Sequence, residues 1–571
     1  MRPLQPTRPT QPTRVEVIES VTKTIGSMAL AYPFLRRLEV ASTIDDVVTR
    51  GQEREVPTGQ VIEVLVLNRL SLRPSPISKV GLWAKSQAVE EVYGVKGEAL
   101  NDDRIGRALD ELHPHILDLW AAIVLKGAKE YRVSLDRLHS DVTRLAFEGD
   151  YADVPTRTED DKPLARVTYG YTGREDPTRK QVTLSLSVTA DGALPTWYKV
   201  SDGNAADTRA YLSHLSAVRQ HLGLDKPLVV GDSKLVSREN LLGFCRVGAR
   251  FIGPTSLSET DRQTLLSLWE AGIPLERLDL PEGTKPTAGR YWGLEFGEIL
   301  KEPDNRTVYP LRRLFVQSLD DRQAARHQRA KDLAKARKTL QTVRHRLSRP
   351  VYRDRKLVER KVEEAIAKVT RHLQVEIVEL AESKGFDLRW RLDHNQLRVD
   401  EAFDGVYCLL TNQSESEADL RAVFLAYKAQ SKVERRFRAI KQPPIEVRPL
   451  WLHQPKRIES LIFVVMVALY LFALIEREAR RVVSQSGQVF VGLRPESRDK
   501  LPVTAERLFE AFAPLGLIKQ RLRLGEEVIE TLTPATLSPI QAQVLERLGL
   551  IKPDLYLQPT ISSTPQEGCG I

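Results

Sequence analysis

Apolar residues recur at intervals of three and four positions over residues 15–129, which predicts amphipathic helices. The pattern is clearest in residues 18–38, 59–70 and 102–128. Asn101 and Asp102 begin the third segment and are residue types that cap helices. We therefore expect a helical N-terminal domain that serves DNA binding, packing or dimerisation. Residues 1–14 are rich in Pro, Thr, Gln and Arg and have no apolar segment, which predicts a disordered arm and excludes a secretory signal.

From residue 130 the pattern changes to short runs rich in Val, Thr, Tyr and Leu and broken by Gly and Asp, which predicts strands joined by turns. The runs cover residues 133–149, 165–172, 180–192 and 194–203. A helix, a short apolar strand that ends at Asp232, a second helix and a further strand are expected in residues 206–254. This order describes a mixed α/β sheet over residues 130–255.

After about residue 255 the strand pattern stops, and residues 322–372 predict two long charged helices broken at Pro350. This stretch has 17 Lys and Arg residues against 5 Asp and Glu, a net charge of +12, whereas the whole chain carries +9. A solvated helix face is the usual explanation of a charge run. We favour helices that face DNA, because one-sided charge repels itself unless a polyanion neutralises it. We assign residues 256–400 to an insertion domain that holds these basic helices.

The pattern of residues 404–413 again predicts a strand, and residues 415–441 are predicted to form one helix. The longest apolar run, Leu461 to Ile475, is too short to span a bilayer comfortably and predicts a buried core helix. We group residues 401–490 with the sheet. The C-terminal region, residues 491–571, is expected to begin with a linker, to hold helices near 504–515 and 539–548, and to end in a disordered tail of about a dozen residues.

The formal net charge of +9 and the pI of about 9.2 suit a polyanionic partner such as nucleic acid. The three cysteines are not in close pairs with metal-ligand spacing, which argues against structural zinc and against a disulfide framework. We expect a soluble protein of the reducing cytoplasm with no membrane partner.

Two aspartates stand out by their positions in predicted strands. Asp141 lies inside an apolar strand, where an unpartnered charge is costly, so it is exposed, paired or bound to a metal. Asp136 is five residues away on the same strand, and alternation puts it on the opposite face. Asp232 follows a buried strand at the end where ligands collect in open α/β sheets. The alternative for either position is an ordinary turn former or helix cap.

The predicted helix 415–441 carries a spaced set of polar residues. Tyr427, Gln430, Glu434 and Lys441 are expected to fall within an arc of roughly 60° at about 100° per residue. Arg435, Arg436 and Arg438 add positive charge around them. A solvated amphipathic helix can produce the same pattern.

Several of these segments resemble bacterial insertion-sequence DDE transposases that carry a Tyr-Arg-Glu-Lys signature. The signature spacing is met by Tyr427, Glu434 and Lys441 in YKAQSKVERRFRAIK, while Gln430 stands where the family has Arg. LHSDVTRLAFEG resembles the segment around the family's first Asp, and GDSKLVSRENL the segment around its second. VTADGALPTWYKVSDGNAADT and IEVRPLWL are also similar to the family. The resemblance covers residues 131 to about 480.

The resemblance implies a ribonuclease-H-like mixed sheet with helices, interrupted by an insertion domain. It implies that Asp141, Asp232 and Glu434 bind two magnesium ions, with manganese as a substitute, and cut DNA. Tyr427, Gln430, Arg435, Arg438 and Lys441 are the expected DNA contacts. The expected partners are terminal inverted repeats, target DNA and a second copy of the chain on DNA, at the nucleoid in the cytoplasm. Two other functions stay open: a nuclease of the same fold that cuts without joining, such as a junction resolvase, and an inactive relic that only binds DNA.

Overall fold

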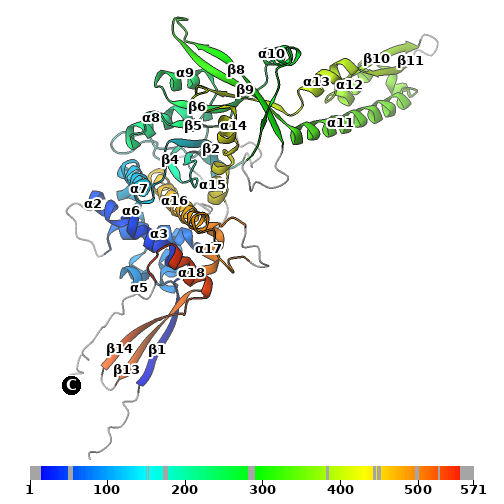
Figure 1. Cartoon of the computed structure of the whole chain (residues 1–571). Coiled ribbons are helices and arrows are strands. Elements are labelled where there is room, and N and C mark those ends of the chain that lie inside the picture. Colours follow the sequence, from blue (N-terminus) through cyan, green and yellow to red (C-terminus); the bar gives the residue numbers. More distant parts are fainter. Residues whose placement is uncertain are drawn as a thin grey trace, which may run out of the picture. The chain divides into compact units, whose positions relative to one another are not determined.

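The structure is a computed structural model of the 571-residue chain, which divides into two compact units (Figure 1). Unit 1 comprises Met1–Val229 and Ala429–Ile571, and unit 2 comprises Val230–Lys428. The structure describes residues 15–48, 56–149, 151, 154–170, 178–280, 290–380, 385–441, 445, 452–494, 501–524 and 527–552. The disordered arm predicted for residues 1–14 and the disordered tail lie outside the described residues.

Helix α16 (Pro455–Ser486) forms the centre of unit 1. Its middle is apolar on every face, so no side of it can be left in water without exposing hydrophobic surface. It is the one described helix long and apolar enough to cross a membrane, but 94% of its most apolar window is buried inside the protein. The prediction of a buried core helix is therefore confirmed.

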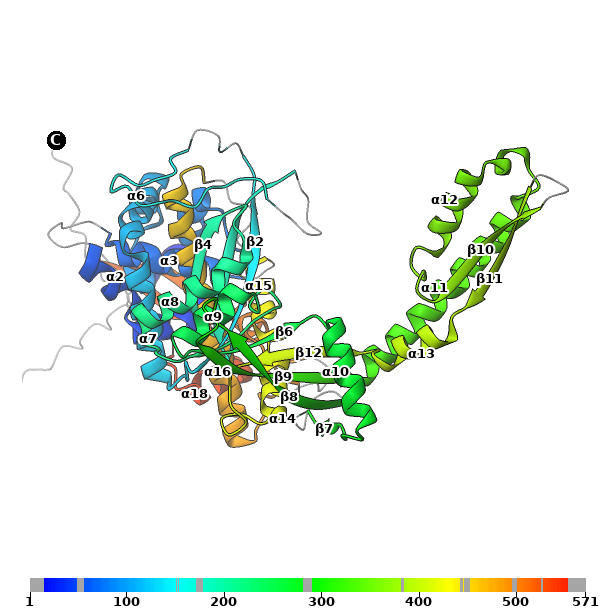
Figure 2. The same cartoon turned by 90° about the horizontal axis from the view of Figure 1, so that it is seen from above.

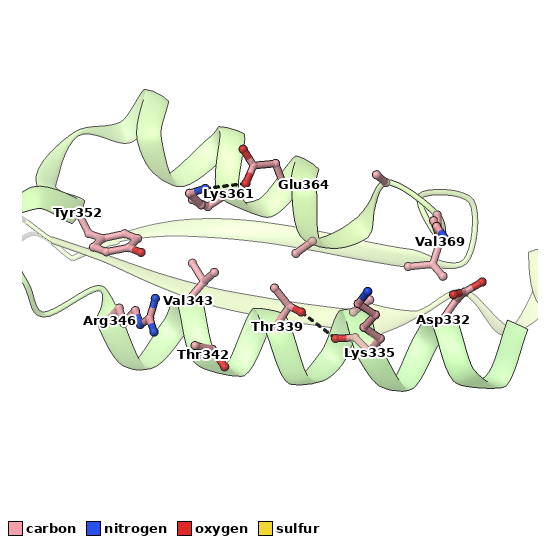
Figure 3. A pocket seen from close by; sticks show the side chains of 14 residues that line it. Asp332, Lys335, Thr339, Thr342, Val343, Arg346, Tyr352, Lys361, Glu364 and Val369 are labelled. Carbon is pink, nitrogen blue, oxygen red and sulfur yellow. Dashed lines mark hydrogen bonds and ion pairs between the residues drawn. The ribbon is translucent and has the colours of Figure 1, made fainter. Parts of the chain in front are cut away.

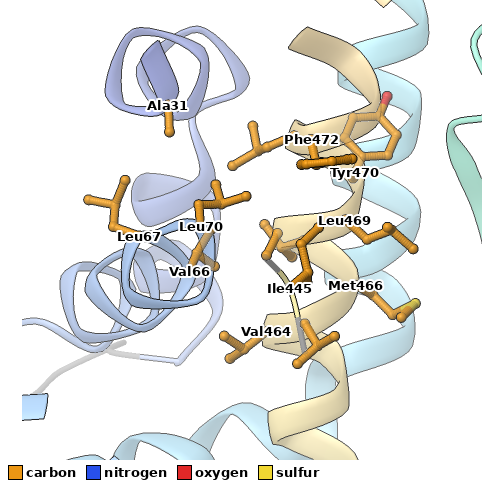
Figure 4. Close-up of a cluster of buried hydrophobic side chains, with 14 of the residues drawn as sticks. Ala31, Val66, Leu67, Leu70, Ile445, Val464, Met466, Leu469, Tyr470 and Phe472 are labelled. Carbon is orange, nitrogen blue, oxygen red and sulfur yellow. The ribbon is translucent and has the colours of Figure 1, made fainter. Parts of the chain in front are cut away.

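The described N-terminal part of unit 1 holds the helices α1 (Met28–Leu38), α2 (Val40–Val48), α3 (Thr58–Leu70), α4 (Val80–Ser86), α5 (Val89–Tyr93), α6 (Asp102–Leu112) and α7 (Ile116–Tyr131). Of these, α1, α3, α6 and α7 pack on α16. Figure 4 shows the side chain of Leu70 on the side of α3 that is turned toward α16, and both helices belong to the same buried apolar cluster. Asn101 caps α6 as expected, since its side chain accepts a hydrogen bond of 2.9 Å from the Arg104 amide.

The N-terminal region is not all-helical, and this prediction is wrong for residues 15–24. Val15–Thr24 is strand β1, which pairs antiparallel with β13 (Gly516–Leu524), and β13 pairs with β14 (Glu527–Pro534). β1 is rich in Val, Ile and Thr, which favour strands, but its partner is about 500 residues away in the sequence. The two C-terminal helices are confirmed as α17 (Ala505–Phe512) and α18 (Pro539–Arg547).

Unit 1 also holds an antiparallel meander of β2 (Arg137–Phe147), β3 (Lys180–Thr189) and β4 (Pro195–Asp202). Helix α8 (Ala210–Leu222) and the fully buried strand β5 (Leu228–Val230) follow. The strand order in this part is β4-β3-β2-β5, and the Leu228 amide donates to the Asp136 carbonyl beside the start of β2. The predicted order of strands and helices is confirmed, except that residues 165–170 form only an isolated bridge at Thr168.

Unit 2 continues from the end of β5 with a second set of strands in the order β5-β6-β12-β9-β8-β7. Its elements are α9 (Arg238–Arg246), β6 (Arg250–Thr255), α10 (Glu259–Glu270), β7 (Glu276–Leu278), β8 (Tyr291–Lys301), β9 (Val308–Ser318), α11 (Leu319–Arg346), α12 (Arg355–Ile366), β10 (Leu373–Leu380), β11 (Gly385–Leu392), α13 (His394–Ala402), β12 (Val406–Thr411) and α14 (Leu420–Lys428).

The prediction that the strand pattern stops after residue 255 is wrong. β8 and β9 are antiparallel strands of eleven residues each, and they carry Glu and Arg among their apolar residues. The charges pair across the two strands: Arg313 bonds Glu298 at 2.7 Å and Arg312 bonds Glu295 at 2.5 Å. Cross-strand pairing of this kind hides the strand signal, because opposite charges replace the apolar alternation.

The predicted break of the basic helices at Pro350 is confirmed. α11 ends at Arg346, a single 3₁₀ turn covers Pro350–Arg353, and α12 returns alongside α11. Figure 2 shows the two helices lying against the β10–β11 hairpin. These four elements share an apolar cluster of their own around Leu340, Val358 and Leu388. We call them the helical-hairpin subdomain.

A close approach between α7 and α16 generates a stability prediction. A Cβ atom added at Gly127 would lie 2.1 Å from the Tyr470 hydroxyl oxygen. An exposed Gly→Ala change in a helix stabilises by about 1 kcal/mol, but the clash outweighs this because overpacking costs about 1–3 kcal/mol. Gly127→Ala is expected to lower the free energy of unfolding, measured by urea denaturation. Adding Tyr470→Phe, which removes the clashing oxygen, should recover part of the loss; no recovery would contradict the proposed contact.

Candidate functional site

Helix α15 (Ser431–Lys441) lies against strand β2 in unit 1. Its inner face is buried through Val433, Phe437 and Ile440. Glu434, Arg435 and Arg438 are exposed on the other side. The helix is therefore amphipathic, and it presents one carboxylate together with two guanidinium groups to solvent.

Gln430, just before α15, joins this helix to the strand that carries Asp141. Its Nε2 donates to the Ser140 carbonyl at 2.9 Å, and its Oε1 lies 3.1 Å from Nδ1 of His139. Both partners are buried residues of β2 next to Asp141. The residue that departs from the family signature thus has a structural contact, while its contact with DNA stays a prediction.

Asp141 lies half-buried in the middle of β2, opposite Leu186 of β3. One of its carboxylate oxygens accepts the Val142 amide at 2.7 Å. Asp136, by contrast, is exposed at the start of the strand and accepts the Ser134 hydroxyl at 2.9 Å. The two aspartates therefore have different surroundings, and Asp141 is the one that lies next to the contact with Gln430.

A buried polar network stands behind this strand. The Ser140 and Ser187 hydroxyls lie 2.6 Å apart, and His214 bonds Ser187 at 2.9 Å and Ser185 at 2.6 Å. Burial lowers the pKa of His139 to about 4 and that of His214 to about 3, so both imidazoles are neutral at pH 7. The sequence pattern does not reveal the buried contacts of His139 and His214, because their partners come from other elements.

The turn between β3 and β4 is held by three cationic side chains. The Lys432 ammonium donates to the Ala190 carbonyl, and Arg436 donates to the Gly192 and Ala193 carbonyls at 2.8 and 3.0 Å. Arg477 of α16 bonds Asp191 in the same turn. This turn lies in the segment VTADGALP, and α15 is fixed to the sheet through it.

Arg436 is not part of the surface charge that the sequence predicts around Glu434. Its side chain is buried, pairs with Glu476 at 3.2 Å and stacks near Phe472. Burial lowers its pKa, and the nearby Glu476 carboxylate opposes that shift. The helical period turns this residue inward, where the β3–β4 turn and α16 supply its hydrogen-bond acceptors.

The predicted single helix over residues 415–441 is wrong. α14 ends at Lys428 and α15 begins at Ser431, with a turn at Ala429 and Gln430 between them. The Lys432 amide bonds the Ala429 carbonyl at 3.0 Å and the Val433 amide bonds the Gln430 carbonyl at 3.2 Å, which is a tighter turn than an α-helix makes. The turn places Gln430 where it bonds β2. Helical periodicity cannot predict this break, because the bonded strand lies about 290 residues earlier in the sequence.

The break divides the predicted signature between the two units. Tyr427 belongs to unit 2, where its ring centroid lies 6.1 Å from that of Tyr407. Only Glu434 and Lys441 share a helix, and a spacing of seven residues places them on one face. Lys441 is half-buried.

Asp232 lies in unit 2, two residues after the end of β5. It is half-buried, and its Oδ1 accepts the Lys234 amide at 3.0 Å while its carbonyl accepts the Leu235 amide at 3.1 Å. These are the bonds of a turn former that leads towards α9. The position at the end of a buried strand is as the sequence predicts.

The three predicted carboxylates are compatible with a hard cation by their chemistry. Each is an oxygen donor, and the amide bonds to Asp141 and Asp232 leave further lone pairs on both carboxylates. Asp141 and Glu434 belong to unit 1 and Asp232 to unit 2. Within the described part of the chain, no group of three or more His, Cys, Asp or Glu side chains lies close enough to hold a metal ion.

The contact of Gln430 with β2 predicts a measurable stabilisation. Gln430→Ala leaves the Ser140 carbonyl and the His139 ring without these partners inside the protein, at a cost of about 1–3 kcal/mol. Urea denaturation is expected to show this loss. Arg435→Ala on the exposed side of α15 is the control and should change stability by less than about 0.5 kcal/mol. Equal effects of the two changes would contradict the structural role of Gln430.

The buried histidines predict a loss of stability in mild acid. Because their pKa values lie below the ordinary value near 6.5, the unfolded chain takes up protons first as the pH falls. Stability that is present above pH 6.5 should therefore decrease between pH 6.5 and about 4, by up to about 1.4 kcal/mol per pH unit for each histidine. His214→Asn should reduce this pH dependence in urea denaturation at pH 7.5 and 5.5, whereas His327→Gln at an exposed site should not.

A family model described as a domain of unknown function (DUF4277) matches residues 20–125. No curated protein matches the chain. Among solved structures, the piggyBac transposase synaptic complex with hairpin DNA is similar at 9% identity and a TM-score of 0.35, over 84% of this chain and 80% of that one. The Mos1 transposase paired-end complex with the left transposon end is similar at 12% identity and a TM-score of 0.14, over 35% and 59%. At TM-scores this low, similarity does not establish a shared fold.

Proposed function

We propose that this protein is a DNA transposase of the insertion-sequence DDE type, which cuts and joins transposon ends. The observation that carries the proposal is the contact between Gln430 and the Ser140 carbonyl. Through it, the helix with the spaced signature lies against the strand whose centre holds Asp141. In the family that the sequence resembles, the first Asp lies on the first strand of a ribonuclease-H-like sheet and the Glu on a later helix.

Within this proposal, Asp141, Asp232 and Glu434 are the catalytic carboxylates. Asp141 and Glu434 come from adjacent elements of unit 1, and Asp232 follows the buried strand β5. Together they would hold two magnesium ions, or manganese as a substitute, which when bound activate water and stabilise the leaving oxygen. The carboxylates themselves supply negative oxygen donors, two from β2 and α15 and one from the turn after β5.

The reaction is phosphodiester hydrolysis followed by joining. A water oxygen attacks phosphorus, the bond to the 3′ oxygen breaks, and that oxygen leaves as a 3′-hydroxyl after taking up a proton. In joining, the freed 3′-hydroxyl attacks a phosphorus of the target strand, forms a new phosphodiester and releases a target 3′-hydroxyl. The same carboxylates serve both steps, because both exchange one oxygen on phosphorus for another.

The proposed DNA contacts surround Glu434. Arg435 and Arg438 are exposed on α15 and have no acidic partner among the described residues. Guanidinium groups beside a carboxylate site suit the flanking phosphates. Tyr427 and Lys441 complete the set by their match to the signature, together with Gln430, which occupies the signature position where the family has Arg. The proposed partners are terminal inverted repeats, target DNA and a second copy of the chain on DNA, and the proposed location is the nucleoid in the cytoplasm.

Loss of any one carboxylate tests the proposal. Asp141→Asn, Asp232→Asn and Glu434→Gln are each expected to reduce magnesium-dependent nicking of a duplex that carries the element's inverted repeat by about a thousandfold or more, because residues that act as one unit fail together. Asp136→Asn is the matched control: it is also an aspartate of the β2 region, but it is exposed and outside the proposed site. It should leave nicking unchanged.

Full nicking by any one of the three variants would refute the assignment of that residue. A strand-transfer assay with pre-cut ends then separates a transposase from a nuclease of the same fold, which would cut but not join. Absence of nicking by the wild-type chain, with binding retained, would favour the relic that only binds DNA.

A further inference from the structure

The helical-hairpin subdomain has a groove between its two helices. The groove has a volume of about 480 Å³, with one wall from α11 and the other from α12 and the residues just after it (Figure 3). Its floor includes Ala336, Val343 and Val369, which belong to the subdomain's own apolar cluster. The groove is therefore supported by a packed core rather than by a mobile surface.

The walls of the groove carry more positive than negative charge. Lys335 and Arg346 stand on α11, and Lys368 follows α12. No ion pair or side-chain hydrogen bond holds these three cations within the described residues. The groove is also lined by two acids and by a fourth cation, Lys361. Asp332 accepts the Gln328 amide at 3.0 Å, and because the amide is uncharged this bond is not an ion pair. Glu364 pairs with Lys361 at 2.6 Å.

A second set of cations in and beside the subdomain contrasts with these three, because its members have acidic partners inside the protein. Arg344 bonds Asp387 at 2.7 Å, Arg355 bonds Glu359 at 2.9 Å, and Arg371 lies 3.3 Å from Asp400. The fold thus separates the positively charged residues of this region into those with and those without an acidic partner. One group is neutralised locally, whereas three of the four cations that line the groove are not.

With Lys361 and Glu364 paired, three cations face one acid, Asp332, so the groove has an excess of positive charge that favours an anion. A chain of phosphates fits better than a single small anion, because further cations with no acidic partner among the described residues continue along α11, the connecting turn and the start of α12. These are Lys331, Arg337, Lys338, Arg349, Arg353 and Lys356. Phosphates regularly spaced along a strand would meet this series, with release of their counterions.

We propose that the groove between α11 and α12 binds the phosphodiester backbone of duplex DNA, with Lys335, Arg346 and Lys368 as its phosphate contacts. The identity of the duplex rests on the proposed transposase function. The location of the contact rests on the charges and packing of the subdomain alone. The contact is independent of base sequence, since ammonium and guanidinium groups bound to phosphate oxygens read no base edges.

The salt dependence of DNA binding tests the proposal. The full-length protein is titrated onto a labelled duplex of about 40 base pairs at several salt concentrations in EDTA, so that binding is measured without cleavage. The triple variant Lys335→Gln, Arg346→Gln, Lys368→Gln is expected to reduce the slope of log K against log salt by about 2.7, because each phosphate contact contributes about 0.9. Affinity at 0.1 M salt is expected to fall roughly a hundredfold.

The matched control is the triple variant Arg344→Gln, Arg355→Gln, Arg371→Gln, which removes the same formal charge from paired positions of the same subdomain. It should change the slope by less than about 1. Equal effects of the two triple variants would overturn the proposal in favour of a general effect of net charge, and an unchanged slope in the groove variant would overturn it outright. A charge-keeping variant, Lys335→Arg, Arg346→Lys, Lys368→Arg, should bind like the wild type; a loss of slope in this variant would contradict phosphate contacts based on charge.

The result is separable from the test of the proposed function. A chain that binds through the groove but never nicks DNA would disprove the transposase function and leave the groove intact. If the chain nicks DNA through its carboxylates but both triple variants have the same salt slope, the transposase function would stand and the groove proposal would fail.

Discussion

The burial of α16 is the constraint on which the rest of unit 1 depends. A helix with an apolar middle on every side must be covered all round, because each exposed Leu, Ile or Phe side chain costs about 1.5–3 kcal/mol. Helices α1, α3, α6 and α7 from the first quarter of the chain, strand β4, and α17 near its end all pack on it. This demand explains why the two ends of a 571-residue sequence share one unit while residues 230–428 form the other.

The position of the candidate site follows from the same helix by way of a few polar contacts. Glu476 of α16 pairs with the buried Arg436 of α15, and Arg436 in turn holds the β3–β4 turn. Gln430 then ties the start of α15 to β2. Each contact satisfies a buried polar group that would otherwise cost free energy, so together they fix the register of α15 against the sheet. Glu434 is exposed because the opposite side of α15 is buried against the sheet and α16.

Sequence patterns worked where the signal is local. The apolar run of α16, the cap at Asn101, the break at Pro350 and the order of strands and helices over residues 180–255 were all predictable, since each depends on neighbours a few positions apart. They failed where an element depends on a partner that apolar periodicity does not reveal. β1 pairs with a strand about 500 residues away, and the charged strands β8 and β9 are stabilised by salt bridges to each other. The division of residues 415–441 into two helices depends on a bond to β2.

The sequence by itself determined which residues are candidates for the chemistry: the three carboxylates proposed as catalytic, the spacing of Glu434 and Lys441, and the excess of positive charge in residues 322–372. Tertiary structure alone decided how they are used. It turned Arg436 inward, gave Gln430 a structural bond and separated the cations of the helical-hairpin subdomain into paired and unpaired sets. The physical reason is that residue type fixes charge and hydrogen-bonding capacity, whereas the partners that satisfy them come from segments far away in the chain.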